Sequence, residues 1–496
     1  MHTVAMTVIQ HLRCLFFVLA VTHLFSPVVE SATNLELSSI FRVCNSWKSF
    51  SRSSLDCSMR NLTDVPANAG HMIKLDKMDL SQNDLKQVGL EDFVNIEMKH
   101  LNLSHNQIAV VFQRPFRRLR KTLEELNLDR NGFKFIPLAV GTLCNIKRLS
   151  LSYNFISDIW LENIMCVTKS IEELDLRGNQ LTYLPLSVNS MKRLTRLDLS
   201  ENRISGVDGL DRLVNLESLN LASNKLQSIP PQIKKLSKLK ELNLFDNQIM
   251  KIPSAAFAGT QLQMLYFGGQ KVAFLSRKAL ASVQEKLEYI NFNSMMITEY
   301  PKIITKCKKL KTLEMADNGL SKLPKRSFHR KAQMIKLNLS RNSFEDVPKT
   351  INRLSNLQTL DLSFNKIMVL KPGTFSKLKN LRKLVLSNNM ILQFSYTAFP
   401  EASLSTIRLD LDVHGNLLTS LDECFFKMDY MKIHLGSNPL HCGCSLYELT
   451  VKGTVSLGQD FRCMSPPPLL NVTSTDLISS LRETCSTETT TKTDCD

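Results

Sequence analysis

One internal repeat dominates the chain of 496 residues and constrains its fold more than any other feature. A typical copy has apolar residues, mostly leucine, at positions 1, 4, 6 and 11, and asparagine at position 9, as from Leu194 to Ile204 and from Leu357 to Ile367. We call position 9 the ladder position, and it recurs every 22 to 27 residues. The sixteen ladder residues are Asn83, Asn106, Asn131, Asn154, Asn179, Asn202, Asn224, Asn247, Gln270, Met295, Asn318, Asn342, Asn365, Asn389, Asn416 and Asn438.

This spacing predicts an α/β solenoid in which each copy adds one coil. In the leucine-x-leucine segment, side chains alternate between core and solvent, as in a short strand. Stacked copies would pair about sixteen such strands, from Leu75 to roughly Leu435, into one parallel sheet on the concave side of a horseshoe. Asparagine both donates and accepts hydrogen bonds, so a column of asparagines can satisfy backbone groups where each coil turns. We expect Phe257, Phe328 and Phe375 to fill the convex side.

Cysteines flank the repeats, where an open solenoid needs capping segments. Cys44 and Cys57 precede the first copy, and Cys442, Cys444, Cys463 and Cys485 follow the last, with Pro466–Pro468 between them. These two segments resemble the caps of extracellular leucine-rich-repeat proteins, including Toll-like receptor ectodomains, Slit-type proteins and secreted matrix proteins. The resemblance implies a leucine-rich-repeat horseshoe with disulfides Cys44–Cys57, Cys442–Cys463 and Cys444–Cys485. It also implies an N-terminal cap at 41–70, a repeat array at 71–437 and a C-terminal cap at 438–485.

The sequence also carries features of an exported glycoprotein. Arg13 followed by the apolar run from Cys14 to Val21 predicts a secretory signal peptide at 1–31, although the same run could be a first buried segment. No later stretch reaches the ~20 apolar residues of a membrane span, and a Thr-rich tail occupies 486–496. We therefore expect a secreted, extracellular protein without a membrane span. Four glycosylation motifs begin at Asn61, Asn102, Asn338 and Asn471.

The remaining cysteines leave several readings open. A Cys-x-Cys pair can bind metal, but an exported chain in an oxidising compartment favours disulfides, so we expect no metal and no cofactor. Cys144 and Cys166 would fall on neighbouring convex arcs, where a bridge is possible. Cys307 and Cys424 occupy positions that hold leucine or phenylalanine in other copies, which predicts buried free thiols. Cys495 has no interpretation.

Two surfaces are candidates for binding. Phe245, Tyr266 and Tyr289 would form an exposed aromatic column on three successive strands, where Gln270 and Met295 interrupt the asparagine ladder and Gly268-Gly269 loosen the turn. An equal alternative to a binding surface is that this stretch is a local irregularity of the repeat covered by an inserted loop. Asp175, Asp198 and Glu314 would give the column an acidic rim. The chain has 62 basic and 46 acidic residues, a net charge of +16, and a basic flank of Lys302, Lys306, Lys308, Lys309 and Lys311 could hold a sulfated polyanion. The simpler interpretation is that these lysines form an ordinary solvent-exposed surface without a ligand.

Together these features predict a binding protein and not an enzyme. None of the glycine-loop, G-x-S-x-G or H-E-x-x-H motifs of common enzymes occurs in the sequence. The expected function is that of a secreted extracellular recognition module whose concave face contacts a protein ligand or receptor, with no nucleic acid in its normal function. The alternative is the ectodomain of a Toll-like innate immune receptor without its membrane and signalling parts.

Overall fold

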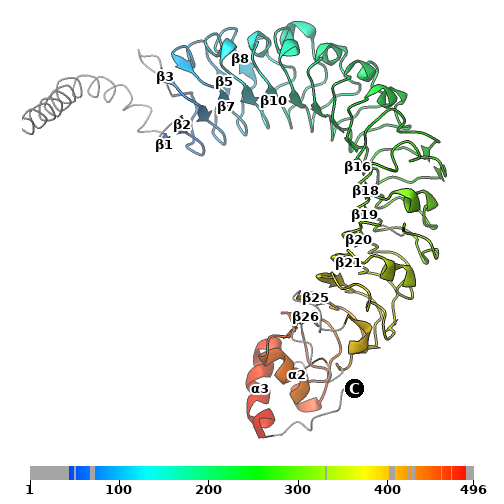
Figure 1. The fold of residues 1–496 in the computed structure, drawn as a ribbon. Coiled ribbons are helices and arrows are strands. Elements are labelled where there is room, and N and C mark those ends of the chain that lie inside the picture. Colours follow the sequence, from blue (N-terminus) through cyan, green and yellow to red (C-terminus); the bar gives the residue numbers. More distant parts are fainter. Residues whose placement is uncertain are drawn as a thin grey trace, which may run out of the picture. The chain divides into compact units, whose positions relative to one another are not determined.

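A computed structural model describes residues 44–49, 52–66, 73–329, 332–400, 408–421, 425, 430–459, 461–470 and 472–487. The predicted signal peptide, Asn471, Cys424, Cys495 and residues 488–496 of the Thr-rich tail lie outside these residues. The chain divides into two compact units, 1–216 and 217–496. In each unit short strands follow one side of the coil, and turns and 3-10 helices follow the other (Figure 1).

The first unit begins with a hairpin of two antiparallel strands, of which the second pairs in parallel with the first strand of the repeats. Its strands are β1 (Asn45–Ser49), β2 (Arg52–Asp56), β3 (Ile73–Lys74), β4 (Lys77–Asp79), β5 (Gln87–Val88), β6 (Ile96–Glu97), β7 (His100–Asn102), β8 (Val110–Val111), β9 (Glu125–Asn127), β10 (Arg148–Ser150), β11 (Glu173–Asp175) and β12 (Arg196–Asp198). Its 3-10 helices are η1 (Leu119–Lys121), η2 (Val140–Thr142), η3 (Leu161–Ile164), η4 (Val167–Lys169), η5 (Leu186–Ser190) and η6 (Leu210–Arg212).

The second unit continues the repeat and ends in two α-helices, α2 (Cys444–Val451) and α3 (Ser474–Thr487). Its strands are β13 (Ser218–Asn220), β14 (Glu241–Asn243), β15 (Lys251–Ile252), β16 (Met264–Tyr266), β17 (Phe274–Leu275), β18 (Tyr289–Asn291), β19 (Thr312–Glu314), β20 (Lys336–Asn338), β21 (Thr359–Asp361), β22 (Val369–Leu370), β23 (Lys383–Val385), β24 (Gln393–Phe394), β25 (Leu409–Asp412), β26 (Met431–His434) and β27 (Val455–Ser456). Its 3-10 helices are η7 (Pro231–Lys235), η8 (Lys302–Lys306), η9 (Lys349–Arg353), η10 (Tyr396–Ala398) and η13 (Pro467–Leu469).

Parallel pairing follows the repeat, with each leucine beside its equivalent in the next copy. Leu149 pairs with Leu174 in the first unit, and Leu337 pairs with Leu360 in the second. Each of the sixteen ladder residues follows one strand of this kind, and the predicted repeat solenoid with a parallel sheet is confirmed. The expected phenylalanines of the convex side, Phe257, Phe328 and Phe375, are all buried.

The ladder asparagines join consecutive copies through the backbone. The buried Asn342 amide donates to the carbonyl oxygens of Met315 at 2.9 Å and Leu339 at 3.0 Å, and its oxygen accepts the Leu320 N–H at 3.0 Å. One side chain thus satisfies polar groups of two coils that would otherwise be buried without partners.

The residue just before each ladder position has a left-handed backbone, which the sequence pattern did not predict. Thirteen of these residues are not glycine, for example Tyr153 with φ 52° and Phe364 with φ 53°, and the other three are Gly178, Gly269 and Gly415. A left-handed backbone is costly for residues other than glycine, so the turn is imposed by the packing of the coil.

Four disulfides lie among the described residues. Cys44–Cys57, Cys442–Cys463 and Cys444–Cys485 have the pairing that the cap resemblance implies. Cys144–Cys166 links neighbouring arcs of the first unit across a Cα–Cα distance of 4.5 Å. Cys307 is a buried free thiol, and burial raises its pKa to about 12.

Candidate functional site

The sheet-face patch, which we define as Phe245, Tyr266 and Tyr289, lies on the solvent face of the second unit's sheet. Tyr266 pairs in register with Asn243 and Asn291, whereas Tyr289 pairs with Met264. Phe245 lies two residues beyond the end of β14. The three side chains come from three successive copies, but each occupies a different row of the sheet, so the column expected from the sequence crosses the strands obliquely.

Tyr266 and Tyr289 form the centre of this patch. Their ring centroids are 4.7 Å apart, close to the ~4.8 Å spacing of neighbouring strands. Both side chains are half-buried. Burial, with the Glu314 carboxyl and Tyr266 adding to it, raises the pKa of Tyr289 to about 12. Burial and the Glu241 carboxyl also raise the pKa of Tyr266. Both phenols therefore stay neutral at physiological pH and offer hydroxyl groups beside an apolar surface.

Phe245 lies over the two glycines instead of against a tyrosine ring. A side-chain carbon built on Gly268 would lie 3.0 Å from the Phe245 ring and 2.2 Å from the Asn293 carbonyl oxygen. One built on Gly269 would lie 2.9 Å from the same ring. Glycine is therefore required here because the Phe245 ring and the next coil approach the backbone closely.

The asparagine ladder is interrupted at one of the two expected positions. Gln270 is buried and repeats the asparagine contacts: its oxygen accepts the Ile249 N–H at 3.0 Å and its nitrogen donates to Leu244 and Phe267. The replacement of asparagine by Gln270 therefore keeps the ladder contacts, because the longer amide reaches the same partners. Met295 is buried and has no amide, and the Val272 N–H instead donates to the Met295 backbone oxygen at 3.3 Å.

Glu314 does not form an open acidic rim. The Lys336 ammonium lies 2.8 Å from one of its carboxylate oxygens, and the Asn338 amide donates to the other at 2.8 Å. Glu314 as a whole is also only 6% exposed, so the expectation for Glu314 was wrong. The other two expected rim residues, Asp175 and Asp198, belong to the first unit. There, burial and the neighbouring carboxylates of Asp198 and Asp129 raise the pKa of Asp175 to about 6.

The basic flank is partly neutralised by the preceding repeat. Lys308 lies 3.3 Å from Glu285, and Lys311 lies 2.7 Å from Glu288. Lys302, Lys306 and Lys309 are exposed and, within the described chain, form no ion pair. This leaves a smaller positive surface than the five-lysine flank expected from the sequence.

The glycosylation motifs differ in accessibility. Asn61 is exposed in the N-terminal cap. In the sheets, the Asn102 amide donates to both Asp79 oxygens at 3.0 and 3.1 Å, and the Asn338 amide contacts Glu314. Of the three motifs whose asparagine lies among the described residues, Asn61 is therefore the one most open to a modifying enzyme.

Several interactions were not predicted from the sequence. Ion pairs join side chains one repeat apart, such as Lys147 with Glu124 and Arg196 with Glu173. Tyr153 lies beneath Arg130, with the guanidinium carbon 4.2 Å from the ring centroid. No group of metal-binding side chains occurs among the described residues. Neither of the two described α-helices is long and apolar enough to cross a bilayer.

Comparisons with known proteins agree with this architecture. A profile described as leucine rich repeat matches residues 169–226, 214–272, 308–367 and 355–410, and a related repeat profile matches 94–110. The chain therefore contains leucine-rich repeats, and its fold is a leucine-rich-repeat solenoid. No curated protein sequence matches it.

Solved structures with the same fold come from Leptospira interrogans, a plant and Drosophila. A leucine-rich-repeat protein of Leptospira interrogans is 27% identical, with a TM-score of 0.60 over 81% of this chain and 95% of its own. A plant peptide hormone receptor, RGFR1, solved in complex with RGF2, is 19% identical, with a TM-score of 0.53 over 83% of this chain and 70% of its own. The glycosylated Toll–Spatzle complex of Drosophila gives 20% identity and a TM-score of 0.50 over 80% of this chain and 54% of the matched chain. At these identities, the last two show the fold alone.

Proposed function

We propose that the chain is a secreted, extracellular recognition module that binds a protein partner through the sheet-face patch. The observation that carries this proposal is the pair of half-buried tyrosines at 4.7 Å on a solvent-facing sheet. Aromatic side chains of this kind are enriched among the residues that dominate binding energy at protein interfaces. Their phenol groups remain neutral and can donate hydrogen bonds to a partner.

The surroundings of the pair favour a protein ligand over a charged small molecule. Asn243 and Asn291 flank Tyr266, Met264 lies beside Tyr289, and the nearby Glu314 carboxylate is neutralised by Lys336. Apart from the Glu241 carboxylate near Tyr266, this surface consists of aromatic, amide and thioether groups, which matches the composition of interface cores. The four described disulfides support an oxidising compartment, which is consistent with an extracellular location.

The test uses the full chain purified from the medium of secreting cells and screened against purified extracellular proteins. For a partner found in this way, Tyr266→Ala/Tyr289→Ala should weaken binding by about 30-fold or more, since a truncated interface anchor costs at least about 2 kcal/mol. Phe274→Ala is the matched control, because Phe274 is an aromatic of the same unit that is 54% exposed outside the patch. Equal binding by the double variant and the wild type would disprove the assignment of the patch.

A further inference from the structure

Exposed apolar side chains gather on the loops after three consecutive ladder residues of the first unit. We call them the loop patch: Phe135, Leu138, Trp160, Leu161, Tyr183 and Leu186. Tyr183 is 64% exposed and Leu186 is 74% exposed, while the Phe135 and Trp160 rings stack at 5.6 Å. Phe135 and Tyr183 lie four positions after their ladder residues, where several other loops carry a polar residue, including Lys251 and Lys322. A contiguous exposed apolar surface on one set of loops marks an interaction site.

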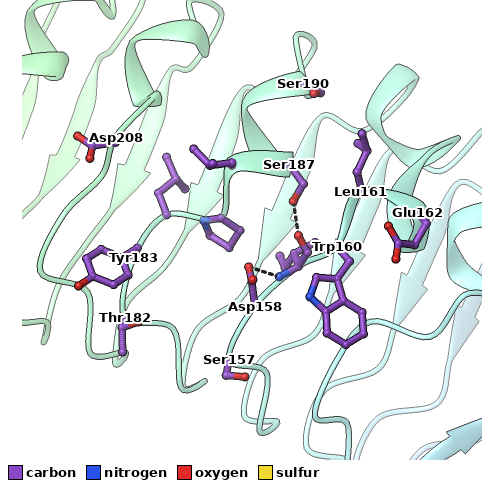
Figure 2. Close-up of a pocket in the computed structure, with 14 residues that line it drawn as sticks. Ser157, Asp158, Trp160, Leu161, Glu162, Thr182, Tyr183, Ser187, Ser190 and Asp208 are labelled. Atoms are coloured by element: carbon purple, nitrogen blue, oxygen red, sulfur yellow. Dashed lines mark hydrogen bonds between the residues drawn. The ribbon is translucent and has the colours of Figure 1, made fainter.

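A groove of about 900 Å³ opens within this patch (Figure 2). Trp160 and Leu161 lie along one side and Tyr183 along the other, with Ile159, Leu184 and Pro185 also lining it. The Ser187 hydroxyl donates to the Ile159 carbonyl oxygen at 2.6 Å, and the Asp158 carboxylate accepts the Ile159 N–H at 2.7 Å. Both backbone polar groups of Ile159, a lining residue, are therefore held by hydrogen bonds within the chain.

The charge of the groove is opposite to that of the whole chain. Its fourteen lining residues include Asp158, Glu162 and Asp208 and no lysine, arginine or histidine. The full chain has a net charge of +16, so an acidic lining beside exposed aromatics sets this surface apart. Such a lining favours a positively charged occupant that also carries apolar side chains.

We propose that this groove binds an extended segment of a partner protein in which arginine or lysine alternates with aromatic or aliphatic residues. Trp160, Tyr183 and Leu186 contact the apolar side chains, and Asp158 and Glu162 pair with the basic ones. The loop patch spans three repeats, about 10 Å at the ~4.8 Å spacing of strands, which fits three to four extended residues. This site lies in the first unit and does not depend on the sheet-face patch of the second.

The two tryptophans of the sequence provide a direct test. Trp47→Phe leaves Trp160 as the single tryptophan, so its fluorescence reports occupancy of the groove in the full chain. The probe is a capped twelve-residue peptide of alternating arginine and leucine. Two counterparts replace every arginine by glutamate or every leucine by serine. We expect a saturable change in Trp160 emission with the first peptide and at least tenfold weaker binding of both counterparts.

Variants then separate contact from general charge attraction. In the Trp47→Phe background, Tyr183→Ala/Leu186→Ala should weaken the basic apolar peptide at least tenfold. Asp158→Asn/Glu162→Gln should weaken it and reduce its salt dependence, because the amide oxygen introduced by Asp158→Asn still accepts the Ile159 N–H while the charge is lost. Phe274→Ala, which removes an exposed aromatic side chain of the second unit outside the groove, is the matched control and should bind as the wild type does.

Three results would overturn the proposal. The first is unchanged emission with all three peptides, and the second is equal binding of the arginine and glutamate peptides. The third is concentration-dependent self-association in sedimentation that Tyr183→Ala/Leu186→Ala abolishes, since this would assign the groove to a second copy of the chain.

Discussion

At the scale of single residues, the amide of each ladder position determines whether the turn of a coil can be buried. The Asn247 amide donates to the Leu221 and Leu244 carbonyl oxygens, and its oxygen accepts the Leu226 N–H at 3.0 Å. Gln270 makes the same set of contacts one repeat later. Because these backbone groups are buried, losing the amide leaves several of them without partners.

We therefore expect Gln270→Ala and Asn247→Ala to destabilise the chain by similar amounts, about 2 to 4 kcal/mol each. Met295→Leu is the control, because it keeps the volume of a ladder residue without an amide and should cost less than about 1.5 kcal/mol. Urea unfolding followed by circular dichroism measures all three. A Gln270→Ala midpoint equal to that of the wild type would show that the glutamine is not part of the ladder.

Asp175 gives a pH-dependent prediction. Its pKa of about 6 in the folded chain lies above the ordinary value of 3.8, so the folded state binds this proton more tightly than the unfolded state. The contribution of Asp175 to stability therefore falls as pH rises from about 4 to 6, and the full cost remains above that window. Asp175→Asn keeps an oxygen that accepts the Arg177 N–H at 2.9 Å.

We expect Asp175→Asn to raise the stability at pH 7.5 by about 1 to 2 kcal/mol, with allowance for the partial exposure of the group. The gain should shrink toward pH 4, and thermal melts across this range measure it. Asp361→Asn, at the equivalent position of β21, is the comparison, and an identical pH profile for both variants would contradict the prediction.

At the scale of elements, the sequence predicts the strands and the core well because both follow from leucine periodicity. The left-handed residue before each ladder position was not predictable, since side chains as different as Gln82, Arg130 and Phe364 occupy it. The oblique placement of Tyr266 and Tyr289 could be seen only from the register of the strands in the structure. The ion pairs could have been found, because Lys240–Glu217 and Lys311–Glu288 are each 23 residues apart, one repeat length.

The Cys144–Cys166 bridge links two neighbouring arcs outside the caps and closes a loop of 22 residues. Its removal in Cys144→Ser/Cys166→Ser should destabilise the chain by about 2 to 3 kcal/mol, since the unfolded state regains the freedom of that loop. Cys307→Ala is the control, because that thiol is free and forms no bridge. Guanidinium unfolding under oxidising conditions compares them, and full stability in the double serine variant would argue against a stabilising bridge.

At the scale of the whole molecule, the chain has a net charge of +16, but its basic side chains are not equally free to attract an anion. Many basic side chains pair with a carboxylate of the preceding repeat, which removes them from long-range attraction to an anion. Within the described chain, Arg114, Arg117 and Arg118 are exposed on one arc without an ion pair, as are Lys302, Lys306 and Lys309 on the basic flank. Affinity for a sulfated polyanion should therefore depend on the unpaired positions and not on the count of basic residues.

This difference can be measured on the basic flank itself. Lys302→Ala/Lys306→Ala/Lys309→Ala should elute from immobilised heparin at clearly lower salt than the wild type. Lys308→Ala/Lys311→Ala should change elution less per charge removed, because Glu285 and Glu288 already neutralise these two lysines at 3.3 and 2.7 Å. An equal decrease in the eluting salt concentration per charge removed in both variants would mean that the ion pairs open when heparin binds. If the triple variant also loses the protein partner while Tyr266→Ala/Tyr289→Ala keeps it, the basic flank and not the sheet-face patch is the binding site.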